Sequence, residues 1–196
     1  MRIELYSDGS ATTSDKPGGY GWVMVINGAK HSEGNGYMDF ASNNDAELEG
    51  AIQGLAAVYQ FLMNAPTLST YSVTLVSDSE IILNWANGTY AFRQENKIQK
   101  YNLLRQHMTS MRVNTRWVQG HTGDEHNERC DRLANAGRLQ VPVDEVKKET
   151  KKKVTTQSFT QDYVVYVKED LKLYVHYKGK IKEIDLEQNT VKEYNE

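Results

Sequence analysis

The chain has 196 residues, of which 39% are hydrophobic, and its formal net charge is −3; this size and composition fit one ordinary domain with an appendage, or two small domains. The near-neutral charge excludes a strongly basic nucleic-acid-binding surface over the whole protein, so any such binding must be local or assisted by metal ions. The single cysteine excludes an internal disulfide framework, and the lack of an apolar leader or a membrane-length run predicts a soluble, cytoplasmic protein without membrane contact.

The first part of the chain predicts three strands followed by a long helix. "MRIELYSD" alternates apolar and polar residues and stops at the turn sequence "DGS". "GGYGWVMVING" and "KHSEGNGYMDF" predict two more strands, joined at Asn27–Gly28, which is a strong hairpin signal. The period then becomes helical in "SNNDAELEGAIQGLAAVYQFLMNAP", with Asn43 or Asn44 available as the N-cap and Pro66 beyond the end.

The next part of the chain alternates strands and helices. "YSVTLVSD" has a nearly continuous apolar run and predicts a buried strand. "SEIILNWANG" predicts a short helix ending at Gly88, and residues 95–111 predict another. "NTRWVQG" predicts a short strand, and residues 124–139 a final helix capped by Thr122 or Asp124. This order predicts an α/β fold with a mixed five-stranded sheet flanked by helices.

The C-terminal part predicts a separate appendage. We expect residues 1–140 to form the main domain, 141–157 a charged linker with proline and a lysine run, and 158–196 a small β-rich extension. The extension offers two or three strands, with turns near residues 169–170 and 178–180. So short a segment buries little apolar surface alone. We therefore expect it to dock on the main domain or on a second chain, or to contact nucleic acid.

Four acidic residues lie where folding can bring them together. Asp8 and Asp78 end predicted strands, Glu47 is in the first turn of the long helix, and Asp131 is in the last helix. Ligands gather at strand ends in sheets of this kind. Converging carboxylates repel one another, and divalent cations that prefer hard oxygen ligands, such as Mg2+ or Mn2+, relieve that repulsion. Taken singly, each acid also has an ordinary explanation as a turn residue, a helix-dipole partner or an exposed helix charge.

Taken together, the motifs of residues 1–140 resemble type 1 ribonuclease H. The matching segments are "YSDGS" followed by "PGGYGW", then "SNNDAELEG", "LVSDSEIIL" and, most specifically, "VQGHTGDEHNERCDRLA". The resemblance implies a ribonuclease H-like fold. It also implies an endoribonuclease that cleaves the RNA strand of RNA–DNA hybrids by Mg2+-dependent hydrolysis, leaving 3′-hydroxyl and 5′-phosphate ends. Residues 141–196 are not covered by it.

The same resemblance implies metal ligands and a catalytic histidine. Asp8, Glu47, Asp78 and Asp131 correspond to carboxylates that bind two Mg2+ ions, for which Mn2+ can substitute. Asp8 would bridge both ions, with Glu47 and Asp78 completing one site and Asp131 serving the other. Two such ions clamp the attacking and leaving oxygens of a phosphodiester. His121 corresponds to a loop histidine that assists proton transfer, which suits a side chain with an ordinary pKa near neutrality.

A further set of residues is implied to contact the substrate, which is distinguished by the 2′-hydroxyls of its RNA strand. Phe40 stands near where some relatives have an arginine, and the segment 85–99 lacks the basic protrusion of many relatives, so we expect weaker hybrid binding. The lysines within residues 147–153 either compensate for this through phosphate contacts or belong to a solvated linker. The implied substrate contacts are Gly9, Ser10, Ser42, Asn43, Asn44, Glu80 and Asn96, with Glu80 standing where many relatives have glutamine.

Three alternatives compete with this interpretation. Residues 119–134, "QGHTGDEHNERCDRLA", suggest zinc because His126 and Cys130 are four apart, but there is no second cysteine, and a small buried Cys130 is favoured. Integrases, transposases and junction resolvases share the implied fold; the Asn-rich start of the Glu47 helix and the His121 loop argue against them. A catalytically idle hybrid-binding module is opposed by the presence of all four carboxylates.

Overall fold

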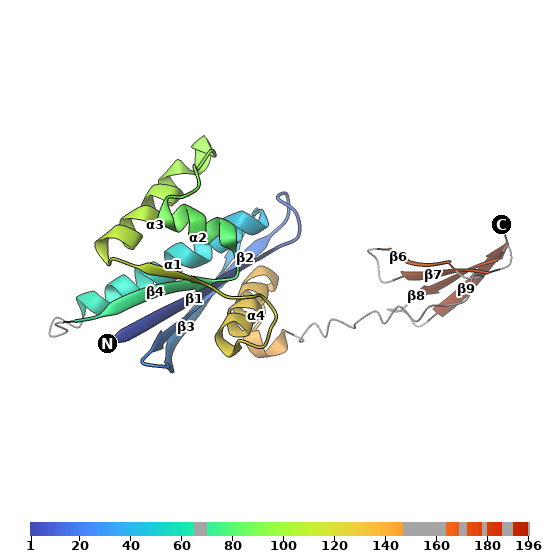
Figure 1. Cartoon of the computed structure of the whole chain (residues 1–196). Coiled ribbons are helices and arrows are strands. Elements are labelled where there is room, and N and C mark those ends of the chain that lie inside the picture. The colour runs from blue at the N-terminus through green and yellow to red at the C-terminus, as the bar shows by residue number, and fades with distance from the viewer. Residues whose placement is uncertain (65–69, 147–163, 169–171, 178–179, 186–189, 196) are drawn as a thin grey trace. The chain divides into compact units, whose positions relative to one another are not determined.

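The computed structural model describes residues 1–64 and 70–146, together with the backbone of four strands farther along the chain (Figure 1). The chain divides into two compact units, Met1–Lys148 and Glu149–Glu196. The division predicted after residue 140 stays a prediction. The short 3₁₀ helix η2 (Val143–Glu145) belongs to the first unit, where Val143 packs against the core.

A mixed five-stranded sheet with the strand order β3-β2-β1-β4-β5 forms the centre of the first unit. The strand β2 (Gly18–Ile26) pairs antiparallel with both β1 (Arg2–Ala11) and β3 (Ala29–Met38), whereas β4 (Ser72–Ser77) and β5 (Asn114–Trp117) run parallel to β1. This arrangement confirms the predicted fold class. The first strand in the sequence is also the central strand, so the acid near its C-terminal end lies between its neighbours.

The β2–β3 connection is the predicted two-residue hairpin. Asn27 and Gly28 have φ angles of 51° and 87°. A two-residue turn that follows the natural twist of two strands needs positive φ at both positions, and asparagine and glycine tolerate it best. The Asn27–Gly28 turn therefore sets the register in which β2 pairs with β3.

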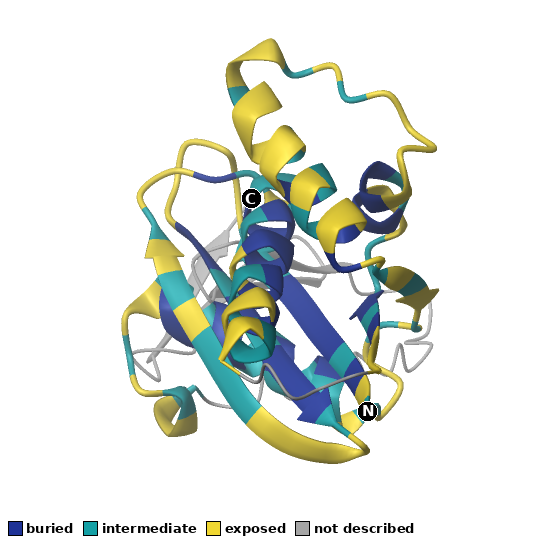
Figure 2. Cartoon of the chain, turned by 90° about the vertical axis from the view of Figure 1, so that its left-hand side faces the viewer, coloured by how far each residue is buried: buried dark blue, intermediate teal, exposed yellow. Residues whose placement is uncertain are grey.

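Helices cover both faces of the sheet (Figure 1). Alternate residues of β1 point to opposite sides: Ile3 and Leu5 pack in a cluster with residues of α1, α2 and α3, whereas Tyr6 packs in a second cluster with residues of α4. The central strands and the sheet-facing side of the helices are buried (Figure 2). In the described part of the chain, no helix has both the length and the apolar character needed to cross a membrane. The helices are α1 (Asn43–Met63), α2 (Glu80–Asn87), α3 (Ile98–Ser110) and α4 (Glu125–Leu139).

The cap of α1 differs from the prediction. Ser42, and neither Asn43 nor Asn44, is the N-cap: its hydroxyl accepts a hydrogen bond from the Asp45 backbone N–H at 3.3 Å. The Asp45 carboxylate accepts one from the Ser42 backbone N–H at 3.0 Å, which completes a capping box. Gly88 ends α2 with a φ of 74°, as predicted. Residue 66, predicted to follow the end of α1, lies outside the described residues.

The second unit contains a four-stranded antiparallel sheet with the order β6-β7-β8-β9. Two or three strands were predicted, and the additional one is "TVKEYN", whose charged residues hide the alternation that marks a strand. The turns predicted near residues 169–170 and 178–179 lie outside the described residues. The four strands are β6 (Val164–Lys168), β7 (Lys172–Tyr177), β8 (Lys180–Asp185) and β9 (Thr190–Asn195).

Candidate active site

Asp8 is the centre of a group of four carboxylates. It lies on β1, its residue is 9% exposed, and its Oδ1 accepts a hydrogen bond from the Gly9 backbone N–H at 2.8 Å. Burial raises the pKa of Asp8 well above its ordinary value, and the charges of Asp78, Asp131 and Glu47 raise it further. Coulombic interactions weaken with distance and with solvent screening. The structure therefore brings together the four acids that the sequence places on four separate elements.

Glu47 has one carboxylate oxygen that is buried without a hydrogen bond. The Asn43 side chain donates to Oε1 at 2.6 Å, while Oε2 has no partner among the described residues. Burial raises the pKa of Glu47 and the charge of Asp78 adds to the rise, whereas the side chains of Ser79 and Asn43 lower it. A buried polar atom is normally satisfied. No donor of the described residues reaches Oε2 within hydrogen-bonding distance, although the Ser79 side chain lies close enough to lower the pKa of the carboxylate.

Gly9 allows β1 to approach α1 closely beside Asp8. A Cβ atom built at Gly9 would lie 2.2 Å from the backbone nitrogen of Glu47 and 2.5 Å from the carbonyl carbon of Ala46. Both atoms belong to the helix backbone, so neither can move aside as a flexible side chain would. The glycine of the "DGS" sequence thus allows the close approach of the Asp8 strand to the Glu47 helix.

Asp78 follows β4 and is held by residues from the C-terminal half of the unit. The Asn127 Nδ2 donates to Asp78 Oδ2 at 3.1 Å, and the Trp117 Nε1 donates to the Asp78 backbone oxygen at 3.0 Å. Asn127 is only 3% exposed. Asn127 lies within the most specific of the matched segments, but sequence reasoning assigned it no role, because nothing in the order of residues signals a buried amide.

Asp131 belongs to a hydrogen-bond network that reaches from α4 to β1. The Asn135 Nδ2 donates to the Asp131 backbone oxygen at 3.0 Å and to its Oδ1 at 3.2 Å. The Asn135 Oδ1 accepts hydrogen bonds from the Ser10 hydroxyl at 2.9 Å and from Arg138 at 3.1 Å. Arg138 Nε also donates to Ser10 Oγ at 3.0 Å. The Ser10 hydroxyl is therefore engaged within the protein.

His121 lies on the loop between β5 and α4, and its side chain is exposed. Its φ is 56°, and Gly123 has a φ of 94°. A positive φ is uncommon outside glycine, although histidine adopts it more readily than most residues. The Thr122 hydroxyl donates to the Gln119 carbonyl oxygen at 2.8 Å, which braces the loop next to the histidine.

The two residues that suggested a zinc site, His126 and Cys130, have other surroundings in the structure. Asp124, one of the two predicted caps of α4, accepts hydrogen bonds from the backbone N–H groups of His126 and Asn127, each at 3.1 Å. The His126 ring lies 5.2 Å from the Tyr6 ring. Cys130 is fully buried, as predicted. His126 is thus a helix-start residue that packs on an aromatic ring.

The carboxylates have the chemistry of a site for hard divalent cations. As the side chains stand, no three His, Cys, Asp or Glu residues of the described ranges approach closely enough to enclose a metal ion. The donors are oxygens, one of them buried without a partner, and Asp8 carries the unfavourable charges of three neighbouring acids. A divalent cation offsets that repulsion, so the chemistry of the residues present fits a hard divalent cation.

The remaining predicted substrate residues are distributed around the start of α1. Lys97 Nζ lies 2.5 Å from Asp45 Oδ1, and this ion pair joins the 3₁₀ helix η1 (Glu95–Lys97), which carries the exposed Asn96, to the cap formed by Ser42. Glu80 is exposed in the first turn of α2. The structure thus brings the Asn96 segment to the Ser42 cap.

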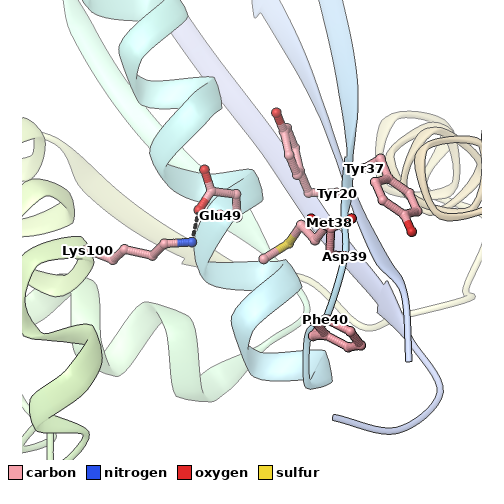
Figure 3. A pocket seen from close by; sticks show the side chains of 7 residues that line it. All are labelled: Tyr20, Tyr37, Met38, Asp39, Phe40, Glu49 and Lys100. Carbon is pink, nitrogen blue, oxygen red and sulfur yellow. Dashed lines mark hydrogen bonds and ion pairs between the residues drawn. The ribbon is translucent and has the colours of Figure 1, made fainter. Parts of the chain in front are cut away.

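An open pocket of about 450 Å³ lies beside this region (Figure 3). Its edge includes Phe40, which is 72% exposed, and on the side of α3 Lys100 Nζ pairs with Glu49 Oε2 at 2.6 Å. Trp85 is instead 9% exposed and packs on Phe92 with a ring separation of 4.9 Å, so it belongs to the core. The pocket is lined by Tyr20, Tyr37, Met38, Asp39, Phe40, Glu49 and Lys100.

Comparison with known proteins agrees with this architecture. A sequence model of the RNase H family matches residues 1–138. Ribonuclease H of Pseudomonas paraeruginosa is 30% identical over 152 residues, which cover 72% of this chain and 96% of the relative. Ribonuclease H of a Sulfurovum species is 34% identical over 139 residues, which cover 68% of this chain and 88% of the relative.

Solved structures show the same fold. RNase H1 of Halobacterium salinarum superposes with a TM-score of 0.61 at 26% identity, covering 72% of this chain and all 100% of that one. LC11-RNase H1, solved in complex with an RNA/DNA hybrid, superposes with a TM-score of 0.59 at 24% identity, covering 70% of this chain and 97% of that one. The family match, the fold and the convergence of four acids around Asp8 agree, and the chain belongs to the RNase H family of hydrolases.

Proposed function

We propose that this protein is a cytoplasmic endoribonuclease that hydrolyses the RNA strand of RNA–DNA hybrids and leaves 3′-hydroxyl and 5′-phosphate ends. The observation that carries the proposal is the buried Asp8, whose pKa is raised by burial and by the charges of Asp78, Asp131 and Glu47, in a member of the RNase H family. The hybrid bound to the structurally similar LC11-RNase H1 supports the choice of substrate.

The proposed chemistry divides the carboxylates between two cation sites. Asp8 would contribute to both, Glu47 and Asp78 would complete one, and Asp131 would serve the other. Two bound Mg2+ ions, or Mn2+ in their place, would stabilise the charge that develops on the attacking and leaving oxygens. His121, exposed on its loop, would accept or return a proton at the edge of the site.

The proposed substrate surface surrounds the start of α1. The backbone at Gly9 and Ser10 and the side chains of Asn43 and Asn44 would contact the RNA sugars, where a 2′-hydroxyl can both donate and accept a hydrogen bond. Ser42 and Asn96 would hold a DNA phosphate. The cationic Lys97, at 2.5 Å from Asp45 in the Ser42 cap, would add favourable charge there. Glu80 would accept hydrogen bonds only, because an ionised carboxylate has no donor.

The proposal is tested with one labelled RNA presented as a hybrid with DNA, as duplex RNA and as a single strand. We expect cleavage of the hybrid alone in Mg2+ or Mn2+ and complete loss of cleavage in EDTA. Folding is checked in parallel by circular dichroism. A folded protein that binds the hybrid but leaves it intact with both cations would favour the binding-module alternative.

The second unit is proposed to strengthen hybrid binding. The lysines predicted to contact phosphates lie within residues 147–153, outside the described residues. Ending the chain after Lys148, the last residue of the first unit, is expected to raise the Michaelis constant for the hybrid about tenfold at low salt. The slope of its logarithm against the logarithm of salt concentration is expected to fall by roughly 0.9 for each phosphate that the shortened protein no longer neutralises.

A matched full-length variant distinguishes the effect of the lysine charges on hybrid binding from the effect of removing the second unit. It carries glutamine at Lys151, Lys152 and Lys153. Equal kinetics for the full-length protein, the truncated protein and this variant would identify the lysine run as a solvated linker.

A further inference from the structure

We propose that Asn127 is a positioning residue that orients Asp78 for cation binding. The inference rests on the proposed function, because it assigns Asp78 to a cation site. The carboxamide of Asn127 donates from Nδ2 to Asp78 Oδ2 at 3.1 Å, and the residue is 3% exposed. A residue next to a metal ligand that fixes the orientation of that ligand commonly matters nearly as much as the ligand itself.

The carbonyl oxygen of the Asn127 side chain indicates that this residue does not serve mainly to stabilise the fold. The Asn127 Oδ1 is buried and has no hydrogen-bond partner among the described residues. Burying a carbonyl oxygen without a donor costs free energy, which an apolar side chain of similar shape would avoid. The sequence nevertheless has asparagine here. Polar groups that break a packing rule concentrate at functional sites.

The backbone of Asn127 is fixed independently of its side chain. Its N–H donates to the Asp124 carboxylate at 3.1 Å, in the cap that begins α4. The side chain therefore projects from the first turn of a capped helix, which restricts the directions it can take. The cap and the amide together connect the start of α4 to the end of β4, where Asp78 lies.

Two other groups contact Asp78, one at its carboxylate and one at its backbone. A Cβ atom built at Gly120 would lie 2.5 Å from Asp78 Oδ2, so the loop backbone closes on the oxygen that Asn127 binds. The Trp117 Nε1 donates to the Asp78 backbone oxygen at 3.0 Å. Asp78 Oδ2 thus faces the loop and α4, and Oδ1 is the oxygen that would face the cation.

Substitution of Asn127 by leucine tests the inference with full-length protein. Asn127→Leu keeps the branching of the side chain and removes both polar atoms. We expect Mn2+ binding, measured by titration calorimetry, to weaken roughly 10–100-fold. The kcat for hybrid cleavage is expected to fall by a comparable factor with an unchanged KM. The Tm of the metal-free protein is expected to change little, because removal of the unpartnered oxygen offsets the loss of the hydrogen bond to Asp78.

Two further variants accompany Asn127→Leu: a control at an exposed asparagine, and a second substitution that disturbs the Asp78 carboxylate. Asn87 is an exposed asparagine whose side chain donates to Thr115 Oγ1 at 2.9 Å instead of to a carboxylate, and Asn87→Ala is expected to leave Mn2+ binding unchanged. Gly120→Ala places a methyl group against Asp78 Oδ2 and is expected to weaken Mn2+ binding even where Asn127→Leu fails to fold.

The outcomes separate this inference from the proposed function. A folded Asn127→Leu protein whose Mn2+ affinity stays within threefold of the unchanged protein overturns the inference, whatever happens to kcat. Activity that falls only in proportion to a lowered Tm overturns it as well. If the unchanged protein binds Mn2+ but cleaves no hybrid, the proposed function fails, and weaker binding by both variants still supports the role of Asn127. If the unchanged protein binds no Mn2+, both fail.

Discussion

Asp8→Asn is expected to lower kcat for hybrid cleavage by at least about 10³-fold, which corresponds to the several kcal/mol of charge stabilisation that bound cations supply. The pKa of Asp8 is raised by the charges of all three other acids, Asp78, Asp131 and Glu47. Its loss therefore weakens both proposed cation sites at once. Single-turnover cleavage assays in Mg2+ and in Mn2+ measure the effect.

The same substitution is expected to stabilise the metal-free protein at neutral pH. The pKa of Asp8 in the folded protein is raised well above its ordinary value of 3.8, so the folded state holds this proton at higher pH than the unfolded state does. The contribution of Asp8 to stability is therefore greatest below about pH 4 and is lost as the pH rises through the raised pKa. At pH 7 the asparagine variant should gain about 2–4 °C in Tm, the shift that about 1 kcal/mol produces in a domain of this size.

Thermal unfolding measured across pH, with and without Mg2+, shows whether the gain in Tm comes from the ionisation of Asp8 or from a pH-independent change in stability. The gain should vanish below about pH 4, where Asp8 is protonated in both states. Mg2+ should raise the Tm of the unchanged protein more than that of the variant, because only the unchanged protein keeps both proposed sites. Glu125→Gln, at an exposed acid in the first turn of α4, is the control. A pH-independent difference in Tm would contradict the assignment.

Gly9→Ala is expected to damage stability and activity together. The added methyl group would meet the backbone nitrogen of Glu47 at 2.2 Å, so β1 and α1 must separate. Forcing such separation costs about 1–3 kcal/mol or more. It also moves Asp8 away from Glu47, and a displacement of about 1 Å at reacting groups costs roughly 10²-fold in kcat. Urea unfolding and steady-state kinetics of the hybrid reaction measure the two effects.

Gly28→Ala is the matched control for this change. Nothing lies within 4 Å of a Cβ at Gly28, but its φ of 87° disfavours any side chain. The free energy of unfolding of the Gly28→Ala variant should fall by about 1 kcal/mol because of backbone strain. Its kcat should stay unchanged, because the hairpin turn is remote from the four acids in the fold. Equal stability of Gly9→Ala and the unchanged protein would show that the strand and helix can separate without penalty.

Sequence periodicity predicted the main unit well because its signals are local. The Asn27–Gly28 turn, the continuous apolar run before Asp78 and the helix ending at Gly88 each depend on a few neighbouring residues. The order of these elements then determines a sheet in which β1 is central. The sequence predicted that Asp8 and Asp78 stand at strand ends. That the two strands are parallel neighbours is a finding of the structure.

The features that sequence reasoning missed are of two kinds. In one, several neighbouring residues suit the same position equally well; in the other, a contact joins residues that are far apart along the chain. Ser42, Asn43 and Asn44 are all good caps, and only the side chain of Asp45, three residues after Ser42, decides among them. The spacing of that pair was a usable signal. The hydrogen bond from Ser10 to Asn135 joins residues 125 positions apart, and no local pattern announces it.

The buried thiol of Cys130 provides the protein with an internal reporter of opening. Thiol reagents attack the thiolate, and burial raises the pKa of Cys130 well above its ordinary value while α4 holds the sulfur against the sheet. No other residue of the chain carries a thiol. The rate at which a dye labels the native protein therefore measures how often α4, and Asp131 with it, leaves the sheet, without any engineered probe.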